Sequence, residues 1–282
     1  MTTRAAGPGL PSLSPASFEL AWRRLRLRCV YLWRHGRLPN LDAPLRFTEW
    51  CQWQKLNDRS LARAMLTDKL HAKDHASACA GREIAVPTLW SGSVLPPQPP
   101  APLPLVVKAN HGCNQYQVVR SAGDWQRARR RSVRWLRADY GEWLDERAYR
   151  SARRLLLVEP FLPGEGAPLP VDFKIYVFGG RAEMIQIHEA RATRKRWTQF
   201  DRNWKRVGGV HSDAEPPSTL AAMFDAAEAC ARGSDFLRVD FYEVGGRLWF
   251  GEYCLNPGSG LHPFKPDSLD LELGRLWSDA RN

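Results

Sequence analysis

The sequence predicts an α+β protein with two lobes, in which helices are mixed with antiparallel β hairpins. Apolar residues recur at helical spacing through much of the first 80 residues. Later apolar segments are joined by Gly-Gly pairs at 179–180 and 245–246, which are typical of hairpin turns. The order of these helices and hairpins shows no internal repeat. With 282 residues, the chain is long enough for one large domain or two smaller ones.

Helices are expected first. The segment 17–37 has the pattern of an amphipathic helix that ends near Gly36, before a proline. A second helix is expected at 48–57. A third is expected from about residue 58 to Gly81, where a glycine can end it.

Strands dominate the rest of the chain. A short strand-like piece at 84–93 leads into a proline-rich loop at 94–104, because proline lacks the amide donor that a central strand needs. The further expected elements are strands at 105–112 and 116–119, a helix at 124–154, a strand at 155–162, a hairpin of 171–180 with 181–191, a polar loop, a helix at 217–233 and a hairpin at 235–254. The expected domains are a tail and amphipathic helix (1–45), an N-terminal lobe (46–160) and a C-terminal lobe (161–282).

Composition limits the class of protein. The chain is 44% hydrophobic and 25% charged, which is typical of a soluble globular protein, and no apolar run is long enough to span a membrane. The first 20 residues lack the apolar block of a signal peptide, so a cytoplasmic location is expected. Six scattered cysteines without a Cys-x-x-Cys pair predict neither a disulfide framework nor a zinc site.

The net charge of +11 is concentrated in two arginine-rich segments, near the start of the chain and at 126–154. Such segments could bind phosphates, nucleic acid or an anionic membrane surface. A solvated helix face is the interpretation we favour, because runs of charge are most often solvated. No nucleic-acid partner is expected, whereas a peripheral membrane contact through the N-terminal basic helix is left open.

The last predicted hairpin carries the sharpest chemical signal. Asp240 and Glu252 lie on its two strands at nearly equal distances from the turn, so both can point to the same face. Two carboxylates held this close repel each other unless a cation lies between them. Oxygen ligands with room for phosphate favour magnesium. A pair of solvent-facing carboxylates is the alternative, and the apolar residues around both positions count against it.

Two lysines lie in apolar strands, Lys108 at the end of one and Lys174 inside another. A lysine is costly to bury without an anion, so phosphate is a natural partner for both. Each could instead extend to solvent from an edge strand, and the sequence does not decide between these two interpretations.

Five motifs in order resemble the ATP-grasp enzymes, and more narrowly their TupA-like branch, which is named for teichuronopeptide synthesis. The resemblance spans about 46–277, and the motifs are TDK (67–69), LVVKANHG (105–112), LLLVEPFL (155–162), DFKIYVFGG (172–180) and RVDFY with GEYCLNPGSG (238–260). It implies an ATP-grasp fold, in which two α+β lobes with antiparallel sheets hold ATP between them and N-terminal helices precede the lobes.

The resemblance also implies roles for individual residues. Those expected to bind ATP are Lys69, Lys108, His111, Gly112, Glu159, Pro160, Phe161, Leu162 and Lys174, the last near the terminal phosphates. Asp240 and Glu252 match the Mg²⁺-binding carboxylates. The family's third ligand position holds Cys254, a poor magnesium ligand, so Asn256 is expected to take its place. His111 could instead only cap its turn, and Asn114 stands where a second glycine is usual in the phosphate loop.

The implied reaction is ATP-dependent ligation of a carboxylate to an amine through an acyl phosphate. Lys174, Arg238 and the backbone amides of the turn Gly258, Ser259 and Gly260 are expected to stabilise the reacting groups. Arg191 and Arg196 lie in an expected basic loop that could hold an anionic substrate or could be solvated. The branch suggests that an amino acid is joined to a sugar acid or polysaccharide in cell-surface polysaccharide biosynthesis.

Two other functions remain open. A kinase on the same scaffold would transfer phosphate to a sugar or lipid-linked hydroxyl and would use ATP and metal in the same way. A basic adaptor that binds nucleic acid or membrane without catalysis ranks last, because buried lysines opposite paired carboxylates make little sense for it. The sequence predicts neither the two substrates nor the oligomeric state.

Overall fold

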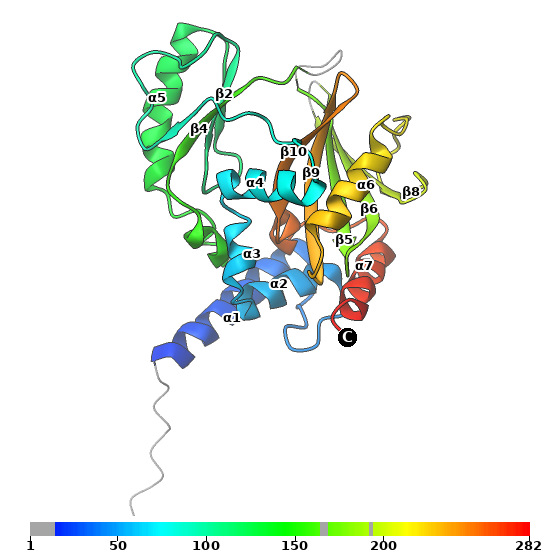
Figure 1. The fold of residues 1–282 in the computed structure, drawn as a ribbon. Coiled ribbons are helices and arrows are strands. Elements are labelled where there is room, and N and C mark those ends of the chain that lie inside the picture. The colour runs from blue at the N-terminus through cyan, green and yellow to red at the C-terminus, as the bar shows by residue number, and fades with distance from the viewer. Residues whose placement is uncertain (1–14, 164–168, 192–193) are drawn as a thin grey trace, which may run out of the picture.

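The computed structural model describes residues 15–163, 169–191 and 194–282, and the side chains of 189–196 lie outside the described part. Its elements form two antiparallel sheets with helices against them, as the predicted α+β class requires. Figure 1 shows the smaller sheet with α5 on one side of the molecule, the larger sheet with α6 on the other, and α1 and α2 beneath them.

The smaller sheet has the strand order β1-β4-β2-β3. Its strands are β1 (Trp90–Gly92), β2 (Leu105–Ala109), β3 (Tyr116–Val119) and β4 (Leu156–Pro160). Alternate residues of β2 point to opposite faces, so Leu105 and Val107 pack against Trp125 of α5 (Ala122–Arg137). Lys108 consequently points to the other face, away from this core.

The larger sheet has the order β10-β9-β5-β6-β7-β8, and every neighbouring pair is antiparallel. Its strands are β5 (Asp172–Phe178), β6 (Arg181–Arg191), β7 (Arg194–Asp201), β8 (Arg206–Gly209), β9 (Phe236–Val244) and β10 (Arg247–Cys254). One face is apolar and packs against α4 (Lys69–Ala80) and α6 (Leu220–Cys230). On the other face, α2 (Phe47–Asn57) and α7 (Asp267–Asp279) cover one end, and polar side chains occupy the remainder.

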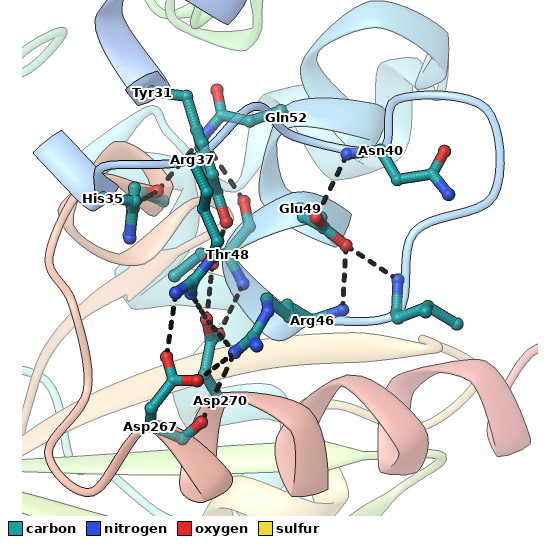
Figure 2. A network of polar contacts seen from close by, with 12 residues as sticks. Tyr31, His35, Arg37, Asn40, Arg46, Thr48, Glu49, Gln52, Asp267 and Asp270 are labelled. Carbon is teal, nitrogen blue, oxygen red and sulfur yellow. Dashed lines mark hydrogen bonds and ion pairs between the residues drawn. The ribbon is translucent and has the colours of Figure 1, made fainter. Parts of the chain in front are cut away.

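Helix α2 is fixed at its start to α7, near the far end of the chain. The Asp270 carboxylate accepts hydrogen bonds from the backbone amide and the hydroxyl of Thr48, at 3.0 and 2.8 Å. Glu49 accepts from the amides of Leu45 and Arg46, which caps the first turn. Figure 2 shows this network, in which Asp267 also pairs with arginines that precede α2. The predicted segment 46–160 thus supplies helices to the larger sheet as well as strands to the smaller one, and the domain division stays a proposal.

Two of the expected helices are shorter than predicted. The helix expected at 58–81 is two helices, α3 (Leu61–Met65) and α4, because Asp68 caps a new start by accepting from the His71 amide. The helix expected at 124–154 ends at Arg137 and is followed by turns and a short 3₁₀ helix, η1 (Arg147–Ser151). Gly141 and Asp145 have φ of 83° and 61° in this stretch, which no continuous helix can accommodate.

The prediction of a basic loop after β6 is wrong. Strand β7 begins at Arg194 and pairs along β6, and β8 follows it, so most of this segment belongs to the larger sheet. Residues 192–193, at the tip, lie outside the described residues. Two further elements had no predicted counterpart, helix α7 and the 3₁₀ turn η2 (Pro257–Gly260). The other predicted strands, and helices α1 (Pro15–His35), α2 and α6, occupy the expected segments with shifted ends.

Candidate functional site

A cavity of about 600 Å³ lies between the two sheets. Its walls come from the polar face of the larger sheet, from the outer face of β2 and β4, from the start of α2 and from the turn after β10. The sheet alternation explains this arrangement, because residues that point away from the two apolar cores are left facing each other. Thirteen of the eighteen predicted site residues line the cavity, and they are Lys69, Lys108, Gly112, Glu159, Pro160, Phe161, Leu162, Lys174, Arg238, Glu252, Asn256, Gly258 and Ser259.

A row of polar residues crosses the larger sheet at one level. Each member is the registered neighbour of the next, and the row reads Glu252, Asp240, Lys174, Gln186 and Gln199. Registered neighbours in antiparallel strands point to the same face. The prediction that Asp240 and Glu252 share a face is therefore confirmed.

Asp240 is enclosed by cations. Its carboxylate is 2.6 Å from Lys174 Nζ, and Arg238 donates two hydrogen bonds to it, each 2.7 Å long. Burial opposes ionisation, but Arg238 and Lys174 outweigh it and hold the pKa of Asp240 below its ordinary value. Asp240 is 1% exposed and does not line the cavity. The buried charge of Asp240 is thus balanced by two cationic side chains, Lys174 and Arg238.

Glu252 is open by comparison. A β-bulge at Gly251 precedes it, and its side chain is 30% exposed and lines the cavity. Lys69 Nζ lies 3.7 Å from its carboxylate, at the limit of an ion pair. Glu252 therefore offers carboxylate oxygens to whatever the cavity holds.

Asn256 supplies a further oxygen beside Glu252. It lies one residue before η2, and its buried Oδ1 finds no hydrogen-bond partner among the described residues. Burial raises the pKa of the Cys254 thiol well above its ordinary value, so that thiol stays protonated and is a weak ligand. Glu252, Cys254 and Asn256 all line the cavity, and the oxygen set Glu252 and Asn256 suits a hard cation such as Mg²⁺.

No three His, Cys, Asp or Glu side chains within the described ranges are placed to hold a metal ion by themselves. Magnesium bound together with a nucleotide needs only one or two carboxylates, because phosphate oxygens and water complete its octahedron. The donors present fit that kind of site and not a preformed, all-protein metal centre.

Two lysines, Lys69 and Lys108, line the cavity beside Glu159, and a third, Lys73, is buried against Glu159. Lys69 starts α4 and donates to the Gly112 carbonyl at 2.8 Å. Lys108 and Lys73 both pair with Glu159, each at 2.6 Å. Burial alone would raise the pKa of Glu159, but the two lysines lower it below its ordinary value. Lys73 was not predicted; its place one helical turn after Lys69 on α4 was the signal that could have found it.

The loop after β2 contains three residues that the sequence analysis named, and the structure places them differently. Gly112 lines the cavity, and Asn114 has φ of 59°, the left-handed conformation expected of it. His111 does not line the cavity. The residue is 3% exposed, and its ring donates from Nε2 to the Trp135 carbonyl at 3.0 Å. The geometry favours the structural interpretation of His111.

The segment after Glu159 provides an apolar wall. Pro160, Phe161 and Leu162 line the cavity at the end of β4, and the Arg120 guanidinium lies 4.9 Å from the centre of the Phe161 ring. These residues follow the strand that pairs with β2, so the wall adjoins Lys108.

The turn after β10 is held by α2. Ser259 and Gly260 have φ of 58° and 64°, and Lys55 Nζ donates to the carbonyl and the hydroxyl of Ser259, both at 2.6 Å. Gln52 donates to the Ser259 carbonyl at 2.9 Å. The Ser259 amide donates to the Asn256 carbonyl, so this amide serves the turn and is not directed at a ligand. The expectation that the turn offers free amides is therefore wrong for Ser259.

The cavity also has an aromatic end that the sequence did not predict. The rings of His188 and Trp197 are stacked with centroids 5.1 Å apart, and the His262 ring centroid lies 4.6 Å from that of Trp197.

Asp172 forms an ion pair with Lys174, whose Nζ lies 2.5 Å from the Asp172 carboxylate. Burial, together with the negative charge of Asp240, raises the pKa of Asp172 to about 6, although Lys174 opposes this.

Arg191 and Arg196 occupy the β6–β7 hairpin, at the end of β6 and near the start of β7. Their side chains lie outside the described part of the chain. Gly260 is buried against α2 and does not line the cavity, although its two neighbours in the turn do.

Several solved structures resemble this chain. An L-amino acid ligase from Bacillus licheniformis has 14% identity and a TM-score of 0.46, over 75% of this chain and 47% of the ligase. A D-alanine–D-alanine ligase from Bacillus anthracis has 17% identity and a TM-score of 0.44, over 77% of this chain and 69% of its own. This chain spans about half the length of the first ligase, and likenesses this distant concern the fold alone. No curated protein matches.

The family comparison is more specific. The sequence model described as TupA-like ATPgrasp matches residues 49–278, which is most of the chain and includes every strand of both sheets. Its range takes in all five motifs and every residue that lines the cavity except Phe47 and Thr48. The chain belongs to the TupA-like ATP-grasp family.

Proposed function

We propose that the protein is an ATP-dependent carboxylate–amine ligase. The observation that carries this proposal is one cavity lined by the amines of Lys69 and Lys108 together with the open carboxylate of Glu252, which lies 3.7 Å from Lys69 Nζ. Amines bind phosphate oxygens, and a carboxylate near them binds the divalent cation that accompanies a triphosphate. Membership of the ATP-grasp superfamily supports the same assignment.

The nucleotide is proposed to lie along the smaller sheet. Lys69, Lys108 and the Gly112 loop would contact the phosphates, while 159–162 would hold adenine and ribose. Magnesium would be held by Glu252 and Asn256, with Asp240 joining if Lys174 releases it. When bound, the ion would neutralise charge on the phosphate oxygens.

The proposed reaction has two steps. A carboxylate oxygen of the first substrate attacks the γ-phosphorus of ATP, the bond to the bridging oxygen breaks, and ADP leaves. An amine then attacks the carbonyl carbon of the acyl phosphate, inorganic phosphate leaves, and the amine loses a proton. Lys174 and Arg238 both line the cavity and would stabilise the negative charge that develops on the reacting phosphate and carbonyl oxygens. The protein supplies orientation and electrostatics without a nucleophilic side chain.

The substrates are proposed to be an amino acid and a sugar acid or polysaccharide, as in cell-surface polysaccharide biosynthesis. The TupA-like branch supports this, and Arg191 and Arg196 remain candidates to hold an anionic substrate. We also keep a cytoplasmic location as a proposal. Over the described ranges, none of the helices combines the length and apolar character that a membrane crossing requires.

A screen would test the proposal. The protein is incubated with Mg²⁺-ATP and pairs of amino acids and uronic acids, and phosphate release is measured with hydroxylamine present as a trap. A ligase yields a hydroxamate, because hydroxylamine attacks the acyl phosphate. Phosphate transfer to a hydroxyl with no hydroxamate would replace the ligase assignment by a kinase. If Mg²⁺-ATP leaves the melting temperature of the protein unchanged, the protein does not bind ATP, and both the ligase and the kinase assignment are wrong.

A further inference from the structure

Helix α1 has a buried face that attaches it to the rest of the protein. Leu27 and Tyr31 are buried, and Arg23 donates to the Asp145 carboxylate at 2.7 Å and to the Lys55 carbonyl at 3.0 Å. The Tyr31 hydroxyl lies 2.8 Å from that of Thr48 on α2 (Figure 2). One side of α1 is therefore fixed in position.

The opposite side of α1 is apolar and exposed. Its residues recur at spacings of four, three, four and three, which places them on one stripe of a helix. The stripe is Phe18, Trp22, Leu25, Cys29 and Leu32, with Trp33 beside its end. Trp22 is 56% exposed and Trp33 77% exposed. Large aromatic residues exposed together along a helix mark an interaction surface.

Arginines border this stripe. Arg26 and Arg28 lie eight and ten positions after Phe18, so helical geometry places them on opposite flanks of the stripe. The Arg26 guanidinium lies 5.9 Å from the ring centre of Trp143, which is 71% exposed and extends the aromatic surface beyond α1. The Arg34 guanidinium lies 5.3 Å from the ring centre of Trp33. The Arg26 guanidinium also pairs with Asp145 at 2.8 Å, so the positive charge beside the exposed aromatic rings comes mainly from Arg28 and Arg34, which are both exposed.

We propose that this face of α1 binds an anionic lipid bilayer, with the helix lying in the interfacial plane. An apolar face with Trp and Phe, bordered by Arg, is the chemistry that enters the headgroup region of acidic membranes. A second copy of the chain fits less well, because a symmetric α1–α1 contact would bring the arginines of both copies together. Glu19, the acidic residue in α1, already pairs with Arg147 and so would not neutralise the arginines of a second copy.

The same helix contacts the turn at the end of the cavity. His35 donates from Nε2 to the Gly260 carbonyl at 3.1 Å, and Arg34 donates to the Leu261 carbonyl at 3.1 Å. Docking of α1 would therefore fix the orientation of the cavity relative to the bilayer. The membrane proposal itself does not depend on the reaction proposed above.

Co-sedimentation of the full chain with vesicles tests the proposal. We expect binding to phosphatidylcholine vesicles that contain phosphatidylglycerol, and much weaker binding to phosphatidylcholine alone. Replacing Trp22 and Trp33 with serine should weaken binding to the anionic vesicles by about tenfold or more, because two large apolar rings would no longer be buried in the bilayer. An unchanged melting temperature would show that the variant is folded.

A matched pair of charge reversals separates this surface from general basicity. Arg28→Glu lies on a flank of the stripe, whereas Arg130→Glu lies on α5, and both positions are exposed and change the net charge equally. Only Arg28→Glu should weaken binding several-fold. Equal weakening by both variants, or no sedimentation with anionic vesicles at low salt, would overturn the proposal. A dimer in light scattering that the Trp22 and Trp33 substitutions dissociate would also overturn it, in favour of a second copy of the chain.

Discussion

Asp240 and Glu252 are directly paired across β9 and β10, yet Asp240 is closed off by two cations while Glu252 opens to the cavity. The two carboxylates therefore differ in what holds them. Asp240 neutralises Lys174 and Arg238 in a buried cluster, whereas Glu252 has only distant contacts among the described residues, Lys69 Nζ at 3.7 Å and the Cys113 thiol at 4.0 Å. Removing the charge of each should have separable consequences.

Glu252→Gln should abolish ATP turnover and leave the fold intact, because the side chain keeps its shape and loses no close ion pair. Asp240→Asn should destabilise the protein by about 3 kcal/mol or more, because it leaves Lys174 and Arg238 buried without their full counter-charge. Phosphate release and urea unfolding measure the two effects. Wild-type turnover in Glu252→Gln would contradict the metal assignment, and a wild-type unfolding midpoint in Asp240→Asn would contradict the structural role.

The contrast between these residues marks the limit of what the sequence could predict. Regular alternation from the turn would pair Asp240 with Gly251 and place Glu252 on the opposite face, so their shared face depends on the β-bulge at Gly251, which the sequence did not predict. Which cations approach Asp240 depends on β5 pairing with β9, which brings Lys174 to Asp240 across 66 residues of sequence. No periodicity in the sequence carries that information, so Lys174 was assigned to phosphate without its carboxylate partner.

Glu159 joins Lys73 and Lys108, and the two lysines differ in exposure. Glu159→Gln should cost about 3 kcal/mol or more, because Lys73 then keeps a buried charge without its counter-ion. Lys108→Ala should cost less stability, since Lys108 is 26% exposed and Glu159 retains Lys73. Lys108→Ala should instead weaken ATP binding. Calorimetry with ATP and urea unfolding of both variants measure these effects, and unaltered ATP affinity in Lys108→Ala would count against its phosphate role.

Asp172 should make stability depend on pH. Its pKa is raised from 3.8 to about 6, so between these values the folded protein binds more protons than the unfolded chain. The contribution of Asp172 is thus fully present below about pH 4 and is lost as the pH rises through 6, by about 3 kcal/mol at most. Asp172→Asn should remove this dependence. The difference between the unfolding free energies of variant and wild type, measured from pH 4 to 7, should favour the variant increasingly as the pH rises. A constant difference would contradict the raised pKa.

The arginines of α5 should be dispensable for ATP use. Arg127, Arg129, Arg130 and Arg131 lie on the helix that covers the far face of the smaller sheet, and none of them lines the cavity. Replacing all four with glutamine should leave Mg²⁺-ATP hydrolysis within about twofold of wild type, since surface substitutions rarely change stability much. Lost hydrolysis would place this surface in the substrate site.

The sequence-based prediction also failed for β7, a strand whose basic residues are typical of a solvated loop. In β7, the run Arg-Lys-Arg precedes only two apolar residues, Trp197 and Phe200, which lie three positions apart and do not alternate, so the segment was predicted as a solvated loop. The turn Pro257–Gly260 shows a related limit. Its glycines were read as a way to bring amides toward a ligand, whereas Gly260 is needed because α2 packs against it. Such packing between ends of a chain leaves no trace in local composition.

That packing yields the last prediction. Gly260 and Gly246 both have positive φ, 64° and 67°, so alanine is strained at either position by about 1 to 2 kcal/mol. The two positions differ in the room that they leave for a side chain. A Cβ on Gly260 would lie 2.6 Å from Cys51 Cβ and 2.8 Å from the Thr48 carbonyl oxygen, whereas a Cβ on Gly246 would meet nothing within 4 Å.

Gly260→Ala should therefore cost roughly 1 to 3 kcal/mol more than Gly246→Ala, since the overlap with α2 adds to the shared backbone strain. Because the neighbouring Gly258 and Ser259 line the cavity, displacement of the turn should also lower phosphate release in Gly260→Ala but not in Gly246→Ala. Urea unfolding and the phosphate assay measure both. If the two alanine variants lose equal stability and equal activity, α2 does not constrain the turn, and the N-terminal helices have no part in shaping this end of the site.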